Sequence, residues 1–582
     1  MMMLNMPRFR TAVLCLILPF VSVPLALGEE PASRNVRDLM GARRGEERKV
    51  VGLLTSKCAF CHGAAASKTE PDLPSDIGGR SNDGWILGDE LVTWNDHDCH
   101  HQAFASLLND QSKQIAKQLG IVDPQGNSLV HRDRRCLSCH SSMPVDQMAS
   151  KGELLQEETS SNPLYTIGVS CEACHGPAGK RADGLEGWGS AHAKPFELDD
   201  PKLWRTLSPQ SQFEEFGYWD VHSSRSQARI CLSCHVGNVE QQKIITHEMY
   251  AAGHPPLPSF ELSQFVEQMG RHWQRLDEKN KVVRDDFLKR RQRLQPDGAA
   301  GEFDPSELAV TKATMIAALV SLEESMQLTA DLIDPSPASN QWPELANYAC
   351  FACHHELQRD GWRKTRRLTT HPGRPTLHEW PFALSRAVTD TLDRERKDFS
   401  FDAEIRGVMT ALNSRPFGNT EELKTAATAL ARTAEARSRE LNSLTINRTR
   451  ARDFLSNIAS VGSAEYVDYD SARQLAWAYE RTNSQLAKTD RIDGTKRSLR
   501  PTAPTEWIGG GHDPGVLALN LWLPDNRLSI APVHLGVGTK KTQFAVDLGK
   551  ILKQSAAYDP EPVRDAFRKL RPLPSTDAAA PK

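Results

Sequence analysis

Five copies of the pattern Cys-x-x-Cys-His constrain this chain more than any other feature of its sequence. Two thiols three residues apart on a short turn can each bond one vinyl group of a haem, and the histidine that follows can ligate its iron. The pattern is therefore the attachment signature of a c-type haem. The five copies are Cys58, Cys61 and His62; Cys136, Cys139 and His140; Cys171, Cys174 and His175; Cys231, Cys234 and His235; and Cys350, Cys353 and His354.

The cysteine count supports five covalently bound haems. Ten of the 12 cysteines lie in the five motifs, Cys15 lies in the apolar leader, and only Cys99 remains. No intramolecular disulfide framework can be built from one thiol. Zinc binding by the Cys-x-x-Cys pairs is the alternative, but zinc does not require a histidine after the second cysteine every time.

The first 28 residues predict export. Arg8 and Arg10 are the only charges there, an apolar run covers residues 11–27, and small residues precede Glu29. This is the pattern of a cleaved secretory signal peptide, and an uncleaved anchor is the alternative. We expect a periplasmic or otherwise exported protein with no further membrane span. Haem attachment outside the cytoplasm agrees with this location.

Composition gives limited further guidance. The chain has 71 basic and 74 acidic residues, so its formal charge of −3 does not suggest nucleic-acid binding. Its 582 residues are enough for several domains. No Walker, Rossmann or Ser-His-Asp pattern stands in a supporting context, and we assign no catalytic residue.

Several other histidines are candidates for the second axial ligand of the irons. His100 begins a stretch with helical apolar spacing, His192 follows a Gly-rich loop, and His247 and His254 stand seven apart, two helical turns. We predict these four as distal ligands. The fifth distal ligand is predicted to be one of His131, His355 and His371.

The texture changes after residue 261. Residues 305–333 have apolar side chains at helical spacing, which predicts a helix with Leu308, Ile316, Leu319, Leu322 and Met326 as its core stripe. Helices rich in Ala, Leu, Arg and Glu are predicted to fill residues 386–490. The last 92 residues are mixed and receive no assignment.

Four segments resemble the multihaem c-type cytochromes typified by the tetrahaem electron carrier that partners hydroxylamine oxidoreductase, the cytochrome c-554-like family. They are G-V-S-C-E-A-C-H-G-P at 168–177, H-x-x-A-F at 100–104, W-x-x-x-H at 188–192 and H-x-M-Y-x-x-G-H-P at 247–255. The resemblance covers residues 50–260. It implies a mainly α fold with little regular sheet, haems packed in pairs, and irons that mostly carry two histidines. The fifth motif and the long helical C-terminal half depart from the family.

These observations predict six segments. They are a signal peptide at 1–28, a four-haem cytochrome domain at 29–260, a helical segment at 261–345, the fifth haem segment at 346–385, a helical region at 386–490 and a mixed region at 491–582.

Three functions fit the sequence. The first is electron transfer through bis-His haems, with redox proteins or quinol-linked donors as partners. The second is a multihaem oxidoreductase with one open iron acting on small nitrogen or sulfur oxyanions. In the third, the helical half binds a partner or a second copy while electrons pass from haem to haem. We favour the first because two imidazoles close an iron to substrates.

Overall fold

The computed structural model describes residues 58, 62–63, 87–142, 154–155, 163–179, 187–192, 204, 207–294, 303–334, 342–354, 374–393, 401–464, 467–492 and 560–570. The predicted signal peptide, Cys61, His355, His371 and most of the mixed C-terminal region lie outside these residues. Within them, the chain forms helices and isolated β-bridges but no β-strand. The predicted mainly α fold is therefore confirmed. None of the described helices combines the length and apolar character required to cross a bilayer.

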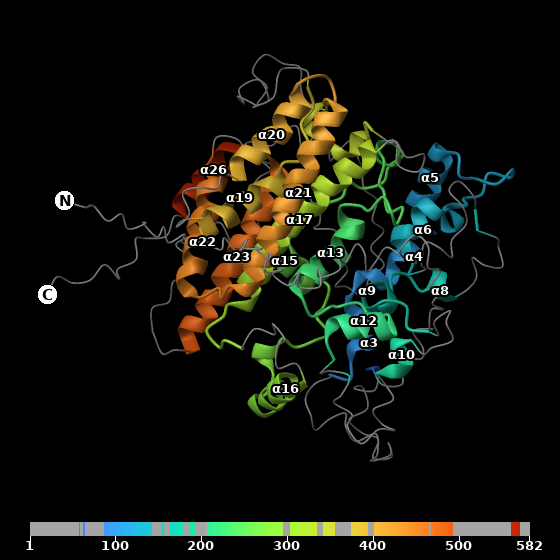
Figure 1. Cartoon of the computed structure of the whole chain (residues 1–582). Helices are drawn as coiled ribbons and strands as arrows, with labels where there is room; N and C mark the ends of the chain where they lie inside the picture. Colours follow the sequence, from blue (N-terminus) through green and yellow to red (C-terminus); the bar gives the residue numbers. More distant parts are fainter. Residues whose placement is uncertain are drawn as a thin grey trace, which may run out of the picture.

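The N-terminal part consists of short helices joined by irregular segments (Figure 1). Because each haem motif needs only one or two helical turns, long helices are not required there. These helices are α3 (Glu90–His97), η3 (Cys99–Gln102), α4 (Ala103–Ser106), α5 (Asp110–Leu119), η4 (Val130–Arg132), α6 (Arg134–His140), α8 (Pro163–Thr166), α9 (Cys171–His175), α10 (Trp188–Ala191), α12 (Pro209–Phe216), α13 (Ser224–His235) and α14 (His247–Ala251).

A short linking region follows, with α15 (Leu262–Gln268), η7 (Leu276–Glu278) and α16 (Lys281–Leu294). The C-terminal part is a bundle of longer helices. They are α17 (Ala309–Ile333), α19 (Trp380–Leu392), α20 (Phe401–Asn413), α21 (Thr420–Ser443), α22 (Arg448–Gly462), α23 (Tyr469–Ile492) and α26 (Pro560–Lys569), with the 3-10 turns η8 (Leu345–Asn347) and η9 (Cys350–Ala352) before α19.

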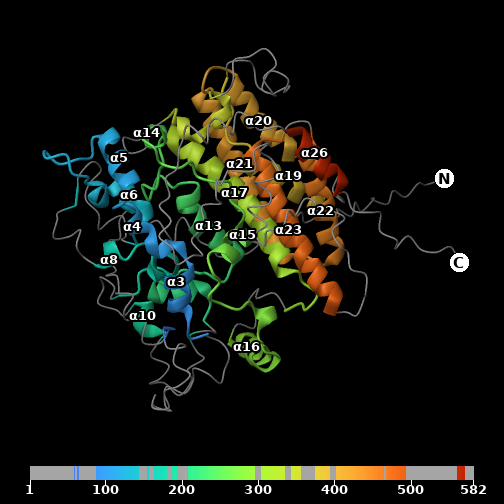
Figure 2. The same cartoon turned by 180° about the vertical axis from the view of Figure 1, so that it is seen from behind.

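Helix α17 is the centre of the bundle. It contacts α13, α15, α19, α21 and α23, and it lies between the short helices and the rest of the bundle in both views (Figures 1 and 2). The five predicted stripe residues are all buried, but so are residues on its other sides, such as Thr314 and Glu324. A helix that is buried all round has no solvent face, so the predicted one-sided stripe describes only part of its packing.

A buried charge cluster joins the two parts of the molecule. Arg225 and Arg229 of α13 reach Glu323 and Glu324 of α17 and Glu435 of α21. Arg229 is only 4% exposed, and removing one partner from such a cluster leaves a buried charge uncompensated. Since α13 ends in a haem motif, the bundle fixes the position of that motif.

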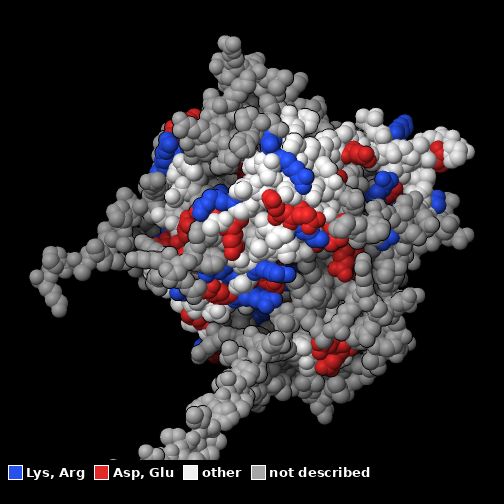
Figure 3. Space-filling view, turned by 45° about the horizontal axis from the view of Figure 1, so that its top comes forward, with Lys and Arg blue, Asp and Glu red and all other residues white. Residues whose placement is uncertain are grey.

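The surface of the described bundle is of mixed charge on the face shown in Figure 3, where basic and acidic side chains alternate. Such a surface offers no single-sign field for a polyanion on this face.

Candidate haem-binding sites

Three of the motifs end a helix with their histidine. Helices α6, α9 and α13 close at His140, His175 and His235, and the fifth motif forms the 3-10 turn η9 with His354 just beyond it. On a helix, positions three and four apart lie on one face. The two thiols and the imidazole of a motif therefore point to the same side, as covalent attachment of a haem requires. Helix α9 stops at Gly176, whose φ of 84° turns the chain away after the motif.

Every motif histidine faces one other histidine at nearly the same distance. The sites are numbered 1 to 5 in the order of their motifs along the chain. The ring centroids are 6.3 Å apart for His62–His192 (site 1), 6.4 Å for His140–His254 (site 2), 6.4 Å for His175–His272 (site 3), 6.4 Å for His235–His100 (site 4) and 6.3 Å for His354–His247 (site 5).

This spacing fits an iron between the two rings. A metal–imidazole bond is about 2 Å long, so two imidazoles on opposite sides of one metal place their ring centroids about 6 Å apart. Ordinary aromatic pairs have ring centroids about 4.5–7 Å apart, so the distinguishing feature is that all five motif histidines face a histidine at one spacing. The donor sets at all five sites therefore fit a haem iron with two axial histidines.

The four predicted distal histidines, His100, His192, His247 and His254, each face a motif histidine. The fifth facing residue is His272, which the sequence reasoning did not propose. It lies between α15 and η7, beyond the predicted end of the four-haem domain at residue 260. Its sequence neighbours, Arg271 and Trp273, carry no haem-associated pattern. His131 lies in η4.

Hydrogen bonds at Nδ1 orient several of these rings. The Nδ1 atoms of His140, His192 and His254 lie 2.8 Å from the backbone oxygens of Ala103, Trp188 and Pro255. A carbonyl oxygen can only accept, so Nδ1 carries the proton and Nε2 is left with its lone pair. This is the tautomer that binds a metal through Nε2.

Two other rings have a carboxylate as the Nδ1 partner. Asp98 Oδ1 lies 2.8 Å from Nδ1 of His100, and Glu90 Oε2 lies 3.2 Å from Nδ1 of His62. Burial lowers the pKa of His100, but the hydrogen bond and charge of Asp98 outweigh it and raise the pKa. Cys99 completes a group of potential metal ligands with Asp98 and His100, and these residues also form the start of η3.

Burial favours the neutral form of three of these imidazoles. Burial lowers the pKa of His175 to about 3 and the pKa values of His235 and His254 to about 4. Only a neutral imidazole has the lone pair that binds a metal, so these rings are in the ligand form at neutral pH. A cavity beside His235 is lined by apolar side chains such as Leu328 and Leu332 and by polar ones such as Thr329 and Glu344.

Contacts join neighbouring sites. Cys58 lies beside Cys171, across sites 1 and 3, and Cys139 lies beside Cys234, across sites 2 and 4. The Trp188 ring lies 6.0 Å from His175 and 5.3 Å from His192, between sites 3 and 1.

Two further connections link site 3 with site 4 and site 5 with site 2. The backbone N–H of Val169, just before motif 3, donates to the backbone oxygen of His100 in site 4 at 3.0 Å. Helix α14 begins with His247 of site 5, and His254 of site 2 follows three residues after its end. Each of the five sites thus adjoins at least one other.

Residues 88–176 match the family described as cytochrome c554 and c-prime. This stretch contains motifs 2 and 3 and His100, and the match supports a c-type cytochrome with covalently bound haem, which implies redox partners. It does not reach motifs 1, 4 and 5 or the helical bundle. No curated protein and no solved structure matches the chain.

Proposed function

We propose that this protein is an exported electron carrier with five c-type haems, each held by two histidines. The observation that carries the proposal is the pairing of every motif histidine with one other histidine at 6.3 or 6.4 Å. Packing alone does not require that all five partners be histidines at one spacing, whereas an iron between each pair accounts for both the residue type and the distance.

The motif cysteines hold the haems covalently, and the paired histidines supply the axial ligands. When bound, each haem iron supplies a one-electron couple between its ferric and ferrous states. The residues around it keep both axial positions filled and fix the imidazole orientation. An iron with two fixed ligands changes charge with little rearrangement, which favours fast electron transfer.

The contacts between sites support one unbranched order: site 1, site 3, site 4, site 2, site 5. Site 1 adjoins site 3 through Trp188, site 3 adjoins site 4 through Val169, site 4 adjoins site 2 through η3 and α4, and site 2 adjoins site 5 through α14. Such an order gives the carrier two ends, at His62 and His354. Redox proteins or quinol-linked donors are the proposed partners.

The alternative is an oxidoreductase with one open iron. Such an enzyme needs an axial position without a protein ligand, next to groups that can move protons. The described residues favour the carrier, because each motif histidine there has a facing histidine. An iron with an open axial position would then arise only if one of the facing histidines were displaced.

The mass of the purified protein and a reductive titration test the proposal. We expect a chain that begins at Glu29, carries five haems and takes up five electrons. A matched variant, Cys350→Ala with Cys353→Ala, should carry four haems and take up four electrons. Four haems in the unmodified protein, or zinc in their place, would overturn the proposal.

A further inference from the structure

We propose that His272 is a displaceable ligand, so that site 3 binds small uncharged ligands of ferrous haem, such as carbon monoxide and nitric oxide. The proposal rests on the proposed function, since it assumes a haem between His175 and His272. It assigns ligand exchange to one site and keeps the other four closed.

The first argument is the Nδ1 atom of His272. It is buried, and no residue in the described part of the chain forms a hydrogen bond with it. A buried N–H without an acceptor is unfavourable, because it has lost its hydrogen bond to water. When the ring leaves the iron and turns toward water, Nδ1 can donate a hydrogen bond to water. This gain partly offsets the loss of the iron–nitrogen bond.

The other distal histidines are better anchored. His100, His192 and His254 each have an acceptor 2.8 Å from Nδ1. His247 is held through its backbone N–H, which donates to Glu344 at 2.8 Å, rather than through its ring. Release of the His100, His192 or His254 ring would break a contact at Nδ1, whereas release of the His272 ring breaks none there.

The second argument is the opposite ligand. Nδ1 of His175 lies 3.2 Å from the hydroxyl oxygen of Tyr218. A phenol is a weaker acceptor than a carboxylate or a backbone carbonyl, so His175 receives less support as an electron donor than His62 or His140. Site 3 thus combines an imidazole with a weak Nδ1 partner and one with none in the described part of the chain. His235 of site 4 likewise has no Nδ1 partner there, but it faces His100, which Asp98 anchors.

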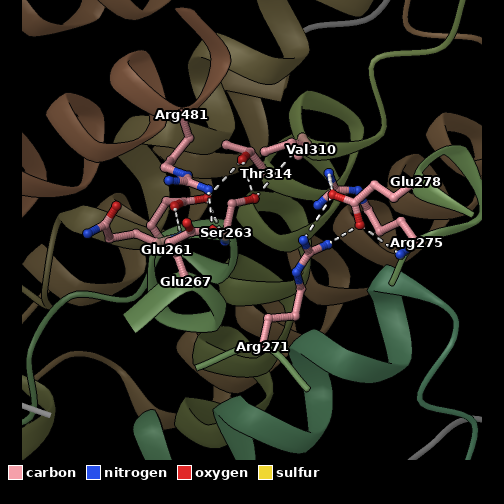
Figure 4. A network of polar contacts seen from close by, with 10 residues as sticks. Glu261, Ser263, Glu267, Arg271, Arg275, Glu278, Val310, Thr314 and Arg481 are labelled. Atoms are coloured by element: carbon pink, nitrogen blue, oxygen red, sulfur yellow. Dashed lines mark hydrogen bonds and ion pairs between the residues drawn. The ribbon is translucent and has the colours of Figure 1, made fainter. Parts of the chain in front are cut away.

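The third argument is that the backbone around His272 is fixed on both sides while the ring is not. Glu278 binds Arg271 and Arg275, with 2.9 Å from Arg271 to Oε1 and 2.6 Å from Arg275 to Oε1 (Figure 4). Gly270 has a φ of 79°, and a Cβ there would lie 2.9 Å from Cβ of His97.

On the other side of this segment, Glu261 is buried and accepts from the backbone N–H groups of Ser263 and Gln264 and from the hydroxyl of Thr314 at 2.9 Å (Figure 4). These bonds tie the start of α15 to α17. The side chain of His272, packed edge-on against Trp273 at 5.0 Å, can therefore rotate without unfolding its segment. Exchange should be reversible.

Carbon monoxide binding to the fully reduced protein tests this inference. We expect one carbon monoxide per five haems in the unmodified protein, at a rate that becomes independent of carbon monoxide concentration because release of His272 limits it. In His272→Ala the number should stay at one, and the rate should become proportional to concentration. His254→Ala, the matched control, should open a second site.

No binding to the unmodified protein, two equivalents in His272→Ala, or an unchanged limiting rate in that variant would overturn the inference. The haem content and the spin state of the oxidised protein are measured independently of carbon monoxide binding. If the oxidised unmodified protein already holds a high-spin iron, the proposed bis-His carrier fails. If all its irons are low-spin and carbon monoxide does not bind, only the displaceable ligand fails.

Discussion

The carboxylate of Asp98 should hold down the reduction potential of site 4. Asp98 is 4% exposed, and its Oδ1 accepts from the backbone N–H of His100 at 3.0 Å as well as from Nδ1 at 2.8 Å. A negative charge on the hydrogen-bond partner makes the imidazole a stronger donor and favours ferric iron. Asp98→Asn removes the charge and keeps an oxygen that can accept the same hydrogen bonds.

The size of the effect follows from the distance. An iron bound at the far nitrogen of His100 would lie about 7 Å from Oδ1, and two unit charges interact there by about 2 kcal/mol at an effective dielectric constant of about 20. For a one-electron couple this corresponds to about 100 mV. We therefore expect Asp98→Asn to raise one of the five potentials by about that amount.

A spectroelectrochemical titration measures the five potentials. Asp96→Asn is the matched control, because Asp96 lies on the same segment but is exposed and its side chain hydrogen-bonds to Asn95. Water and salt screen its charge, so its removal should leave the titration unchanged. The reasoning is refuted if Asp98→Asn moves no potential, or if it moves all five equally.

The remaining predictions concern stability and the cysteine count. Leu319→Ala, at a fully buried position, should lower the free energy of unfolding by about 2–5 kcal/mol, whereas Val282→Ala, at a site 76% exposed, should change it by less than about 0.5 kcal/mol. Arg229→Ala should cost about 3–5 kcal/mol because it removes one of the two cations that compensate the buried glutamates, while Arg439→Ala, at a half-exposed ion pair, should cost at most about 1 kcal/mol. Urea unfolding followed by circular dichroism checks both pairs, and equal effects within a pair would contradict the packing described. Alkylation of the unfolded mature protein should label one thiol, that of Cys99, and labelling of more would mean that a motif lacks its haem.

Much of the site could be predicted because the haem motif is local in sequence. Two cysteines and a histidine within five residues fix the attachment point without knowledge of the fold. His100, His192, His247 and His254 were accessible for a similar reason, since each stands in a short segment that resembles a known family.

His272 could not be predicted in this way. Its position opposite His175 depends on the path of the chain after α15, on the turn at Gly270 and on the bonds of Glu278 to Arg271 and Arg275. These are tertiary contacts, and no local pattern encodes them.

The fold, too, could be predicted only where it is encoded by local sequence. The helical character of residues 305–333 follows from their spacing, and the helix spans Ala309–Ile333. Its burial on all sides depends on α13, α19, α21 and α23 packing around it, which a single helix cannot reveal. The cluster of Arg225, Arg229 and the three glutamates likewise joins residues about a hundred or more positions apart.

The electron paramagnetic resonance spectrum of the air-oxidised protein tests the central claim most directly. The paired imidazole planes are near parallel at sites 1 and 5, at 24° and 19°, and near perpendicular at sites 2 and 4, at 87° and 83°, with 59° at site 3. Near-parallel planes separate the iron dπ orbitals and give rhombic low-spin signals, whereas near-perpendicular planes give a strongly anisotropic low-spin signal. We predict five low-spin irons per chain, two of them rhombic and two strongly anisotropic. A high-spin signal of one haem equivalent would contradict five bis-His sites.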